Sequence, residues 1–179
     1  MNTKAGATFA IAFLALGAFQ AVTGIFDEEG DTPAAHAASN TSPVKPEGHR
    51  PTEGKLGTPY KKPGSAWISG YHTGIDFIVP AGTPVRAADR GSVVSAGWGG
   101  QYGNQIVIRH EDGTYTQYAH LSRIDVRAGS TVTGGKQIGL SGATGNAFGP
   151  HLHFEARTGP DYGSDIDPVA WLSDHGTTV

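Results

Sequence analysis

Glycine is the residue that most constrains this chain, because it accounts for 27 of 179 residues and is joined by 11 prolines. Both residues disfavour helix interiors. Short apolar runs lie between these turn-forming residues, at 75–79, 93–94, 105–110, 114–120, 137–141 and 151–157. We therefore predict an all-β domain, a small antiparallel twisted sheet or sandwich, with one short helical turn near 168–172. A helical bundle or coiled coil is excluded.

Charge and cysteine content narrow the functional classes. The formal net charge is −3, which does not suit a nucleic-acid binder that works by releasing counterions. The chain has no cysteine, so disulfides, thiolate zinc sites and cysteine nucleophiles are excluded. Any metal ion must therefore be held by carboxylates and by the eight histidines.

The first 26 residues are predicted to lie outside the folded domain. An uncharged, largely apolar stretch covers 5–26, with Lys4 before it and an acidic run after it. As a helix rising 1.5 Å per residue it would be roughly 33 Å long, close to the thickness of a membrane core. It is either a cleaved signal peptide or a retained membrane anchor. Both interpretations place the rest of the chain outside the cytoplasm, with the membrane contacted only through this segment.

Residues 27–56 are rich in Pro, Ala, Thr and Ser and hold few large apolar side chains. Such a segment cannot bury enough surface to offset the entropy of ordering, so we expect a disordered linker. The folded domain is expected at 57–174, followed by a tail at 175–179. Whether the linker covers the functional site is left open.

Two local histidine patterns suggest a metal or catalytic site. One is His72-Thr-Gly-Ile-Asp76, and the other is His151-Leu-His153. In a strand, alternate residues point to the same face, so His151, His153 and Glu155 should share one face and leave the apolar residues between them for the core. By the same alternation, Tyr118 and His120 should share a face.

Three segments carry a resemblance to a known family. They are Gly70-Tyr-His-Thr-Gly-Ile-Asp76, Tyr118-Ala-His-Leu121 and Gly149-Pro-His-Leu-His-Phe-Glu155. Together with their order and spacing, they resemble the lysostaphin/LytM-type zinc metallopeptidases. The resemblance implies a small antiparallel β fold with an active-site groove across the sheet. It also implies a Zn²⁺-dependent endopeptidase that uses zinc-activated water to hydrolyse peptide stems or cross-bridges of bacterial peptidoglycan.

The resemblance also assigns residues. It implies that His72, Asp76 and His153 are the zinc ligands and that His120 and His151 are the catalytic pair. Which of the pair is the general base is left open. A set of three protein ligands leaves one position of a tetrahedral zinc free for water, as a catalytic site requires.

Other histidines and polar residues receive weaker interpretations. We expect Glu155 to have a polar role beside a ligand or at the strand edge rather than to be a ligand, and His110 to be structural or solvated. We expect no specific role for His175. Three aromatic residues are hypothesised to line the groove: Trp98, Tyr102 and Phe148.

An alternative function stays open, in which the domain is a non-catalytic or latent peptidoglycan-binding relative that regulates other cell-wall hydrolases. The bond is also open among glycyl–glycine, D-alanyl–glycine and D-alanyl–diaminopimelate. The expected partners are peptidoglycan peptides, with no nucleic acid, and the expected state is a monomer.

Overall fold

The computed structural model describes residues 47–179. The predicted signal peptide or anchor at 1–26, and the linker as far as residue 46, lie outside the described residues. Among residues 47–179, no helix is both long and apolar enough to cross a membrane.

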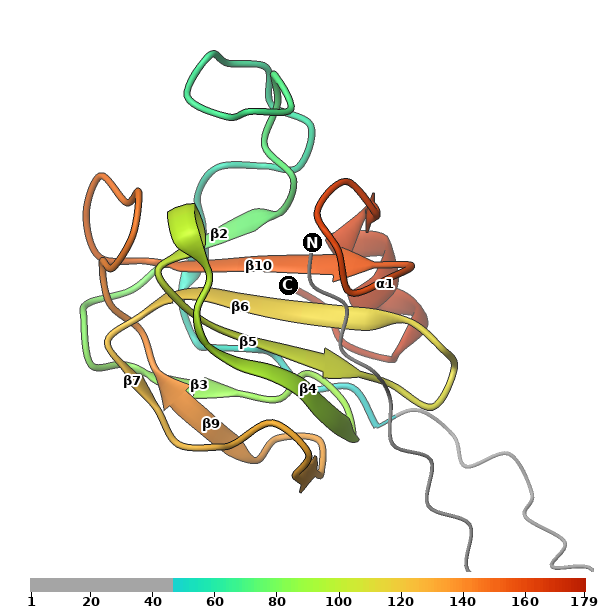
Figure 1. Ribbon diagram of the computed structural model, residues 1–179. Helices are drawn as coiled ribbons and strands as arrows, with labels where there is room; N and C mark the ends of the chain where they lie inside the picture. The colour runs from blue at the N-terminus through green and yellow to red at the C-terminus, as the bar shows by residue number, and fades with distance from the viewer. Residues whose placement is uncertain (1–46) are drawn as a thin grey trace, which may run out of the picture. The chain divides into compact units, whose positions relative to one another are not determined.

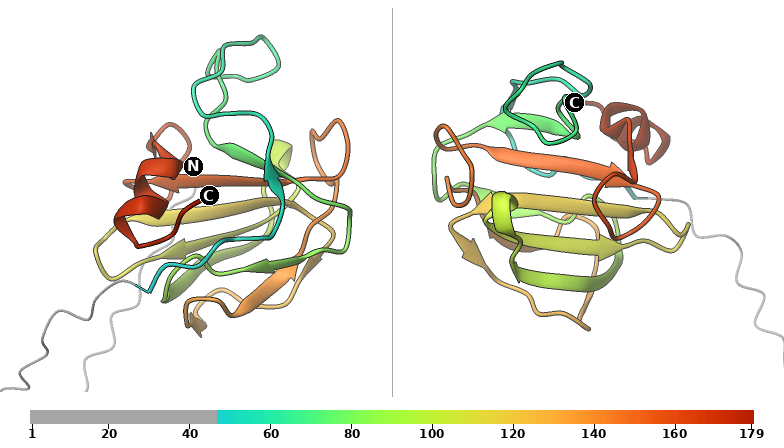
Figure 2. Two further views of the ribbon diagram at one scale, coloured as in Figure 1. Left: turned by 180° about the vertical axis from the view of Figure 1, so that it is seen from behind. Right: turned by 45° about the horizontal axis from the view of Figure 1, so that its top comes forward.

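Two antiparallel sheets form the described part of the chain, as Figures 1 and 2 show. The larger, eight-stranded sheet has the order β1-β2-β10-β6-β5-β4-β8, with β11 also paired to β10. The smaller sheet has the order β3-β9-β7. The large-sheet strands are β1 (Lys55–Leu56), β2 (Ile75–Ile78), β4 (Gly91–Trp98), β5 (Asn104–Arg109), β6 (Tyr115–Leu121), β8 (Thr131–Val132), β10 (Leu152–Arg157) and β11 (Asp165–Ile166).

The remaining elements are β3 (Pro84–Arg86), β7 (Arg123–Ile124), β9 (Gln137–Leu140), a 3₁₀ turn (Gly100–Tyr102) and α1 (Pro168–Asp174). This architecture confirms the predicted all-β antiparallel class with a short helix near the C-terminus. The apolar runs expected at 105–110 and 114–120 form a β-hairpin, β5–β6, whose turn is closed by the N–H of His110 donating to the carbonyl of Thr114 at 2.8 Å. Gly113 takes the left-handed conformation, with φ of 86°, which glycine adopts without steric cost.

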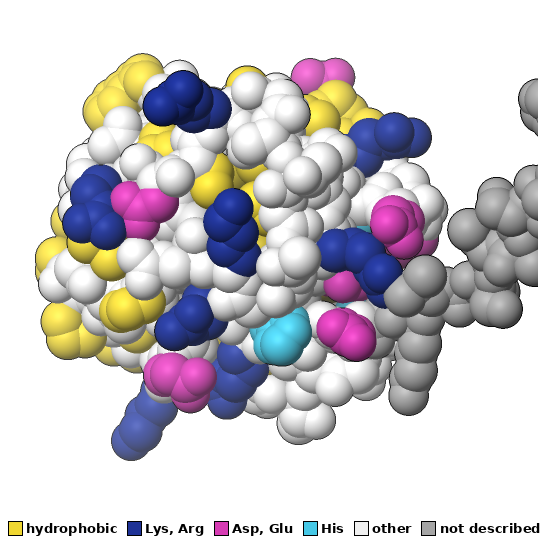
Figure 3. Space-filling model, turned by 90° about the horizontal axis from the view of Figure 1, so that it is seen from below, with side chains coloured by type: hydrophobic (Ala, Val, Ile, Leu, Met, Phe, Trp, Pro, Cys, Tyr) yellow, Lys and Arg dark blue, Asp and Glu magenta, His cyan; other side chains and the backbone are white. Residues whose placement is uncertain are grey.

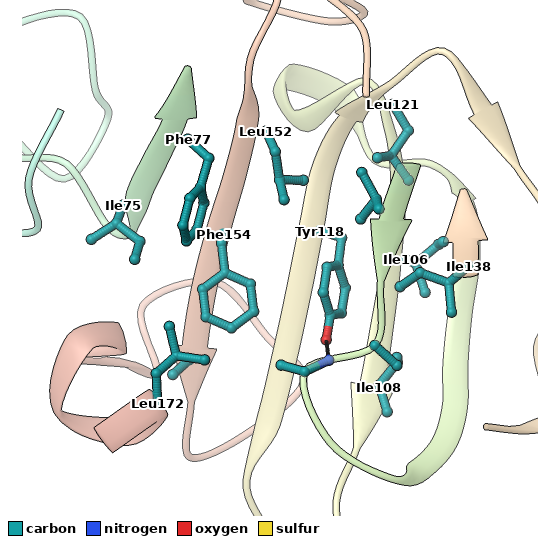
Figure 4. Packing of buried hydrophobic residues seen from close by; sticks show 14 of the residues in the cluster. Ile75, Phe77, Ile106, Ile108, Tyr118, Leu121, Ile138, Leu152, Phe154 and Leu172 are labelled. Carbon is teal, nitrogen blue, oxygen red and sulfur yellow. Dashed lines mark hydrogen bonds between the residues drawn. The ribbon is translucent and has the colours of Figure 1, made fainter. Parts of the chain in front are cut away.

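The core lies on the face of the large sheet that is turned toward the small sheet and α1, and Figure 4 shows its packing. Phe154 and Tyr118, which are register partners on β10 and β6, pack with ring centroids 5.4 Å apart. Ile138 of β9 and Leu172 of α1 close the cluster from the other side. Burial of each such side chain contributes about 1.5–3 kcal/mol. The core therefore fixes β10 with its apolar residues inward, which turns His153 to the opposite face.

One alternation expected from the sequence is wrong. Tyr118 faces the core, where its hydroxyl accepts a hydrogen bond from the N–H of Ala88 at 2.8 Å (Figure 4). His120 lies two residues further along β6 but has a φ of +60°. This left-handed residue breaks the period-two pattern, and the His120 ring lies on the other face, 5.8 Å from the His153 ring. Tyr118 therefore supports the core and not the site.

The domain begins earlier than residue 57. Residues 47–56, which the sequence places in the linker, make backbone hydrogen bonds to the domain, including His49 N–H to the Ala88 carbonyl at 2.7 Å and Arg86 N–H to the Pro51 carbonyl at 2.8 Å. Thr52 is buried, and β1 pairs with β2. Because these contacts are mostly made by the backbone, the polar composition of the segment gave no sign of them.

The C-terminal tail is likewise part of the domain. His175 is 6% exposed, stacks on Trp171 at 3.7 Å and donates from Nδ1 to the Trp171 carbonyl at 2.8 Å. The N–H of Thr177 donates to the Leu172 carbonyl at 2.8 Å. The expectation that His175 has no specific role is therefore wrong, because it ends α1 and packs beneath it.

Candidate metal centre and active site

The five residues assigned by the resemblance line one groove of about 530 Å³. The groove is lined by the 66–69 loop, the 3₁₀ turn and the 146–150 loop. In Figure 1 the loops before β2 and before β10 rise beside the same part of the sheet. The face seen from below in Figure 3 instead shows Lys and Arg side chains dispersed among Asp and Glu.

Three donor atoms converge at the floor of this groove. His72 Nε2 lies 2.9 Å from His153 Nδ1 and 3.1 Å from Asp76 Oδ1. His153 Nδ1 lies 3.1 Å from the same Asp76 oxygen. His72 comes from the loop before β2, Asp76 is in β2, and His153 is in β10. The pairing of β2 with β10 sets His153 directly opposite Asp76, so the sheet register itself brings two of the three together.

The donor set fits a small divalent metal ion. Two imidazole nitrogens and one carboxylate oxygen are ligands that zinc accepts at about 2.0–2.2 Å, which places neighbouring ligands of a tetrahedral ion roughly 3.3 Å apart. The three atoms already lie 2.9–3.1 Å apart. Within residues 47–179, this is the one group of His, Cys, Asp and Glu side chains with such convergence. Three protein ligands would leave one position of a tetrahedral zinc ion for water.

The protonation of the cluster suits a cation. Burial opposes ionisation of Asp76, but hydrogen bonds with His153 and His72 hold the pKa of its carboxyl well below the usual range. Burial also opposes protonation of His153, yet hydrogen bonds with Asp76 and Glu155 raise its pKa to about 9. A metal ion bound here would therefore have to displace a proton from His153 Nδ1.

The ring of His72 is fixed from behind. Its Nδ1 donates to the Pro59 carbonyl at 3.1 Å, which leaves Nε2 as the free donor atom toward Asp76. The Trp67 ring packs against it at a centroid distance of 5.1 Å. His72 is only 1% exposed, so its orientation is set by packing as well as by the hydrogen bond.

His120 and His151 stand beside the three donor atoms and are held in the same way. His120 Nδ1 donates to the Thr144 carbonyl at 2.8 Å, and His151 Nδ1 donates to the Gly149 carbonyl at 2.8 Å. Each ring thus carries its proton on Nδ1 when neutral and presents a basic Nε2. The ring centroids are 4.7 Å apart, and His151 Nε2 is 3.8 Å from Asp76 Oδ1.

Burial also determines the charge of His120. Burial, assisted by the nearby positive charge of His153, lowers the pKa of His120 to about 4. The ring is therefore neutral at physiological pH and able to accept a proton at Nε2. A neutral histidine beside the three converging donor atoms is chemically suited to accept a proton.

Family comparisons agree with this geometry. The model of "Peptidase family M23" matches residues 70–168, which contain all five of these residues and more than half of the chain. The chain belongs to peptidase family M23. The matched range runs from the loop before His72 to the first residue of α1, so it covers the large sheet from β2 onward, the 3₁₀ turn and the 146–150 loop, whereas the 66–69 loop precedes it.

Named relatives show how much of the chain is shared. The DD-carboxypeptidase/endopeptidase Mpg of Neisseria meningitidis is 48% identical over 99 residues, which are 55% of this chain and 22% of that protein. The catalytic domain of the antimicrobial peptidase lysostaphin from Staphylococcus simulans superposes with a TM-score of 0.64 and 37% identity, covering 67% of this chain and 92% of that domain. A zinc-containing peptidase from Vibrio cholerae gives a TM-score of 0.52 and 36% identity, over 57% and 32% of the two chains. The chain therefore spans only about a fifth of the matched Neisseria relative.

The pattern along β10 only partly indicated one buried carboxylate of this M23 domain, that of Glu155. Glu155 is 1% exposed and its Oε1 accepts from His153 Nε2 at 2.9 Å. Burial opposes its ionisation, but hydrogen bonding with His153 and the charge of Arg157 lower its pKa to about 2. The alternation of His151, His153 and Glu155 along β10 was the sequence signal, and the contact with His153 favours a role beside that histidine over a role at the strand edge.

The groove aromatics only partly match expectation. Tyr102 and Phe148 line the groove of this M23 domain, whereas Trp98 is not among its lining residues. Trp98 ends β4 and is 68% exposed. Phe148 is 94% exposed at the groove wall, and Ile68 is 75% exposed on the facing loop. Apolar side chains thus flank the donor atoms from both walls.

Proposed function

We propose that this chain is a zinc-dependent endopeptidase that hydrolyses peptide stems or cross-bridges of bacterial peptidoglycan outside the cytoplasm. The observation that carries the proposal is the convergence of His72, Asp76 and His153 beside two further histidines in one groove. Membership of peptidase family M23 supports a peptidase. The donor set, together with the zinc-containing Vibrio cholerae peptidase, supports zinc as the metal.

In this proposal His72, Asp76 and His153 hold the ion, and the site carries a net charge of about +1. When bound, zinc supplies a Lewis acid that polarises the scissile carbonyl and lowers the pKa of water from 15.7 to about 7. The protein residues do the rest of the chemistry. The neutral Nε2 of His120 or His151 accepts the proton of the attacking water, and the protonated ring then donates to the developing oxyanion or to the leaving amine.

The fixed tautomers support this division of labour. Because Nδ1 of both His120 and His151 is committed to a backbone carbonyl, the proton that each ring gains or loses is held at Nε2, on the groove side. The two residues differ in burial, since His120 is buried and His151 is only partly buried. His120 is the better placed base, and His151 is the better placed to reach a substrate group in the groove.

The substrate class is inferred from the relatives and from the groove. The Neisseria relative is named for DD bonds, and lysostaphin is described as an antimicrobial peptidase. Peptide bonds between D-residues are a feature of the bacterial cell wall. The open groove, with Phe148 and Ile68 exposed on its two walls, suits an extended peptide better than a compact small molecule.

The test uses the purified full-length protein and peptidoglycan sacculi of several cross-link types. Zinc is quantified per chain, and new free amines are followed with and without a chelator. We expect about one zinc per chain and amine release that the chelator abolishes and added zinc restores. The wall type that responds then narrows the bond. Bound zinc without amine release from any wall would contradict the proposal and support the non-catalytic regulator instead.

A further inference from the structure

We propose that Glu155 is a positioning residue that fixes His153 with Nδ1 turned toward the metal, and that Thr73, Tyr102 and Arg157 in turn hold the Glu155 carboxylate in place. The inference deepens the proposed zinc function and rests on it. It concerns how one ligand is oriented, and it adds residues to the site that do not touch the ion.

The first step is the orientation of the His153 ring. Its Nδ1 faces the two other donor atoms, at 2.9 Å from His72 Nε2 and 3.1 Å from Asp76 Oδ1. A neutral imidazole that offers Nδ1 as a ligand must carry its proton on Nε2. His153 Nε2 lies 2.9 Å from Glu155 Oε1, and an ionised carboxylate only accepts hydrogen bonds. The contact therefore selects the tautomer that leaves Nδ1 free for the metal.

The second step is how the carboxylate is held. Thr73 donates its hydroxyl to Glu155 Oε1 at 2.5 Å, and Tyr102 donates to the same oxygen at 2.7 Å. Arg157 Nε donates to Oε2 at 2.7 Å. Both Glu155 and Arg157 are almost fully buried, at 1% and 2% exposure. Each carboxylate oxygen thus has a fixed donor in addition to His153, and the group cannot rotate away without leaving a buried charge unpaired.

The network also reaches neighbouring strands. Arg157 Nη2 donates to Gln117 Oε1 at 2.5 Å and to the Tyr102 hydroxyl at 3.2 Å. Gln117 is on β6, and Tyr102 is in the 3₁₀ turn that forms part of the groove wall. The orientation of His153 is therefore tied to the sheet and to the wall that faces the substrate.

This network explains the residues that separate His72 from Asp76 in the motif His72-Thr-Gly-Ile-Asp76. The residues between His72 and Asp76 include Thr73, which donates to Glu155, and Gly74. A Cβ added at Gly74 would lie 2.3 Å from the Phe154 carbonyl oxygen, 2.8 Å from Glu155 Cγ and 2.9 Å from His153 Cε1. Only glycine permits so close an approach. The loop between two ligands is thus shaped to fit against the third ligand and its supporting carboxylate.

The central experiment measures zinc affinity, with a fluorescent chelator as competitor and the full-length protein at one fixed pH. The variants are Glu155→Gln, Thr73→Val and Thr73→Ser. Loss of such an outer partner typically weakens metal affinity by about 10–100-fold, so we expect that range for Glu155→Gln. We expect a smaller loss for Thr73→Val, and recovery in Thr73→Ser, which restores the hydroxyl.

Thr116→Val is the matched control. Thr116 is as buried as Thr73, and its hydroxyl contacts His110 Nε2 at 2.8 Å and the Tyr118 hydroxyl at 3.0 Å, away from the groove. The same chemical change there should leave the zinc dissociation constant unchanged. A network that served only stability would lower the melting temperature in both Thr→Val variants without separating their zinc affinities.

A second readout reports the tautomer directly. In ¹⁵N-labelled, zinc-loaded wild-type protein, the His153 Nε2–H proton should give a downfield resonance protected from solvent exchange. In Glu155→Gln it should move upfield or be lost to exchange. If Glu155→Gln does not fold, the Thr73 series decides the question.

The outcomes separate the two proposals. Wild-type protein that binds no zinc would overturn the proposed function, and this inference with it. Wild-type protein that binds zinc, with Glu155→Gln or Thr73→Val unchanged in affinity and in the Nε2–H resonance, would overturn the positioning role alone.

Discussion

The two ends of the large sheet both gather histidines, but in different ways. One end, here called the site end, holds the rings of His72, His120, His151 and His153 and the carboxylate of Asp76. The other end, here called the α1 end, holds His110, Trp171 and His175 with Asp89 and Asp112, where α1 meets the β5–β6 hairpin (Figure 1). Rings stack closely there too, with Trp171 and His175 only 3.7 Å apart.

The ends differ in what the ring nitrogens face. At the α1 end, His110 uses Nδ1 on the Arg90 carbonyl and Nε2 on the Thr116 hydroxyl, both at 2.8 Å, and burial lowers its pKa. His175 uses Nδ1 on the Trp171 carbonyl and places Nε2 3.3 Å from Asp112. At the site end, one nitrogen of each ring makes a hydrogen bond to the protein around the site, and the other nitrogen faces the groove. We therefore expect metal binding or catalysis where a histidine ring has one nitrogen without a scaffold partner, and not simply where histidines are numerous.

The largest predicted effect is the loss of zinc and activity on alanine substitution at the site end, with alanine substitution at the α1 end as the control. Replacing His72, Asp76 or His153 by Ala removes one of the three proposed ligands, so bound zinc and peptidase activity should both be lost. His175→Ala removes an equally buried histidine from the α1 end and should keep zinc. Metal analysis after gel filtration, with amine release from sacculi, checks both. Zinc loss in His175→Ala would remove the distinction between the ends.

The next effect separates the residues within the site end. His120→Ala or His151→Ala should lower the rate of cleavage by about 10²–10⁴-fold, the usual contribution of a general acid or base. Zinc content should stay near that of the wild type, because neither Nε2 belongs to the converging donor set. Parallel zinc analysis and initial rates measure this. Loss of metal from His120→Ala would show that the assignment of ligands is wrong.

The third predicted effect is a loss of folding stability at the α1 end with no change in zinc affinity. Trp171 is 4% exposed, and its indole N–H donates to Thr114 Oγ1 at 2.9 Å. Trp171→Ala should lower the free energy of unfolding by about 3–5 kcal/mol, because a large cavity opens under the helix. Urea unfolding in the presence of chelator measures the loss. The zinc affinity of the folded variant should match the wild type, and a weaker affinity would link the two ends.

Much of the fold was predictable because its signals are local. The hairpin turn at Gly113, the apolar runs and the alternation along β10 each depend on neighbouring residues. The pairing of His72 and Asp76 with His153 needed the sheet register, which no local pattern encodes. The family resemblance supplied that long-range information, and the convergence of the three donor atoms agrees with it.

The missed features share a physical cause. Residues 47–56 and the tail after α1 are held largely by backbone hydrogen bonds, which leave no mark on composition. The orientation of His120 depends on a single left-handed residue inside a strand, which a period-two pattern cannot anticipate. Arg157 and Gln117 were not singled out from the sequence, because nothing in a local pattern indicates that these polar side chains are buried and joined to Glu155.

The smallest predicted effect concerns the left-handed backbone conformation of His120. At a φ of +60° a side chain with a Cβ costs about 1–2 kcal/mol, and glycine avoids this cost. His120→Gly should therefore be more stable than His120→Ala by about 1 kcal/mol. In an ordinary strand position the order is reversed, since glycine is about 0.5–1 kcal/mol worse than alanine. Tyr115, which is partly exposed at the start of β6, provides that reference through Tyr115→Gly and Tyr115→Ala.

Chemical denaturation of these four variants in the presence of chelator gives the two differences. Opposite signs at the two positions would show that the strand stores backbone strain at His120 in order to turn its ring from the core to the groove. The same sign at both positions would mean that the ring reaches the groove without strain. The carbonyl of Thr144, which accepts from His120 Nδ1, would then be the main element that orients it, and the 142–150 loop would set the position of the proposed base.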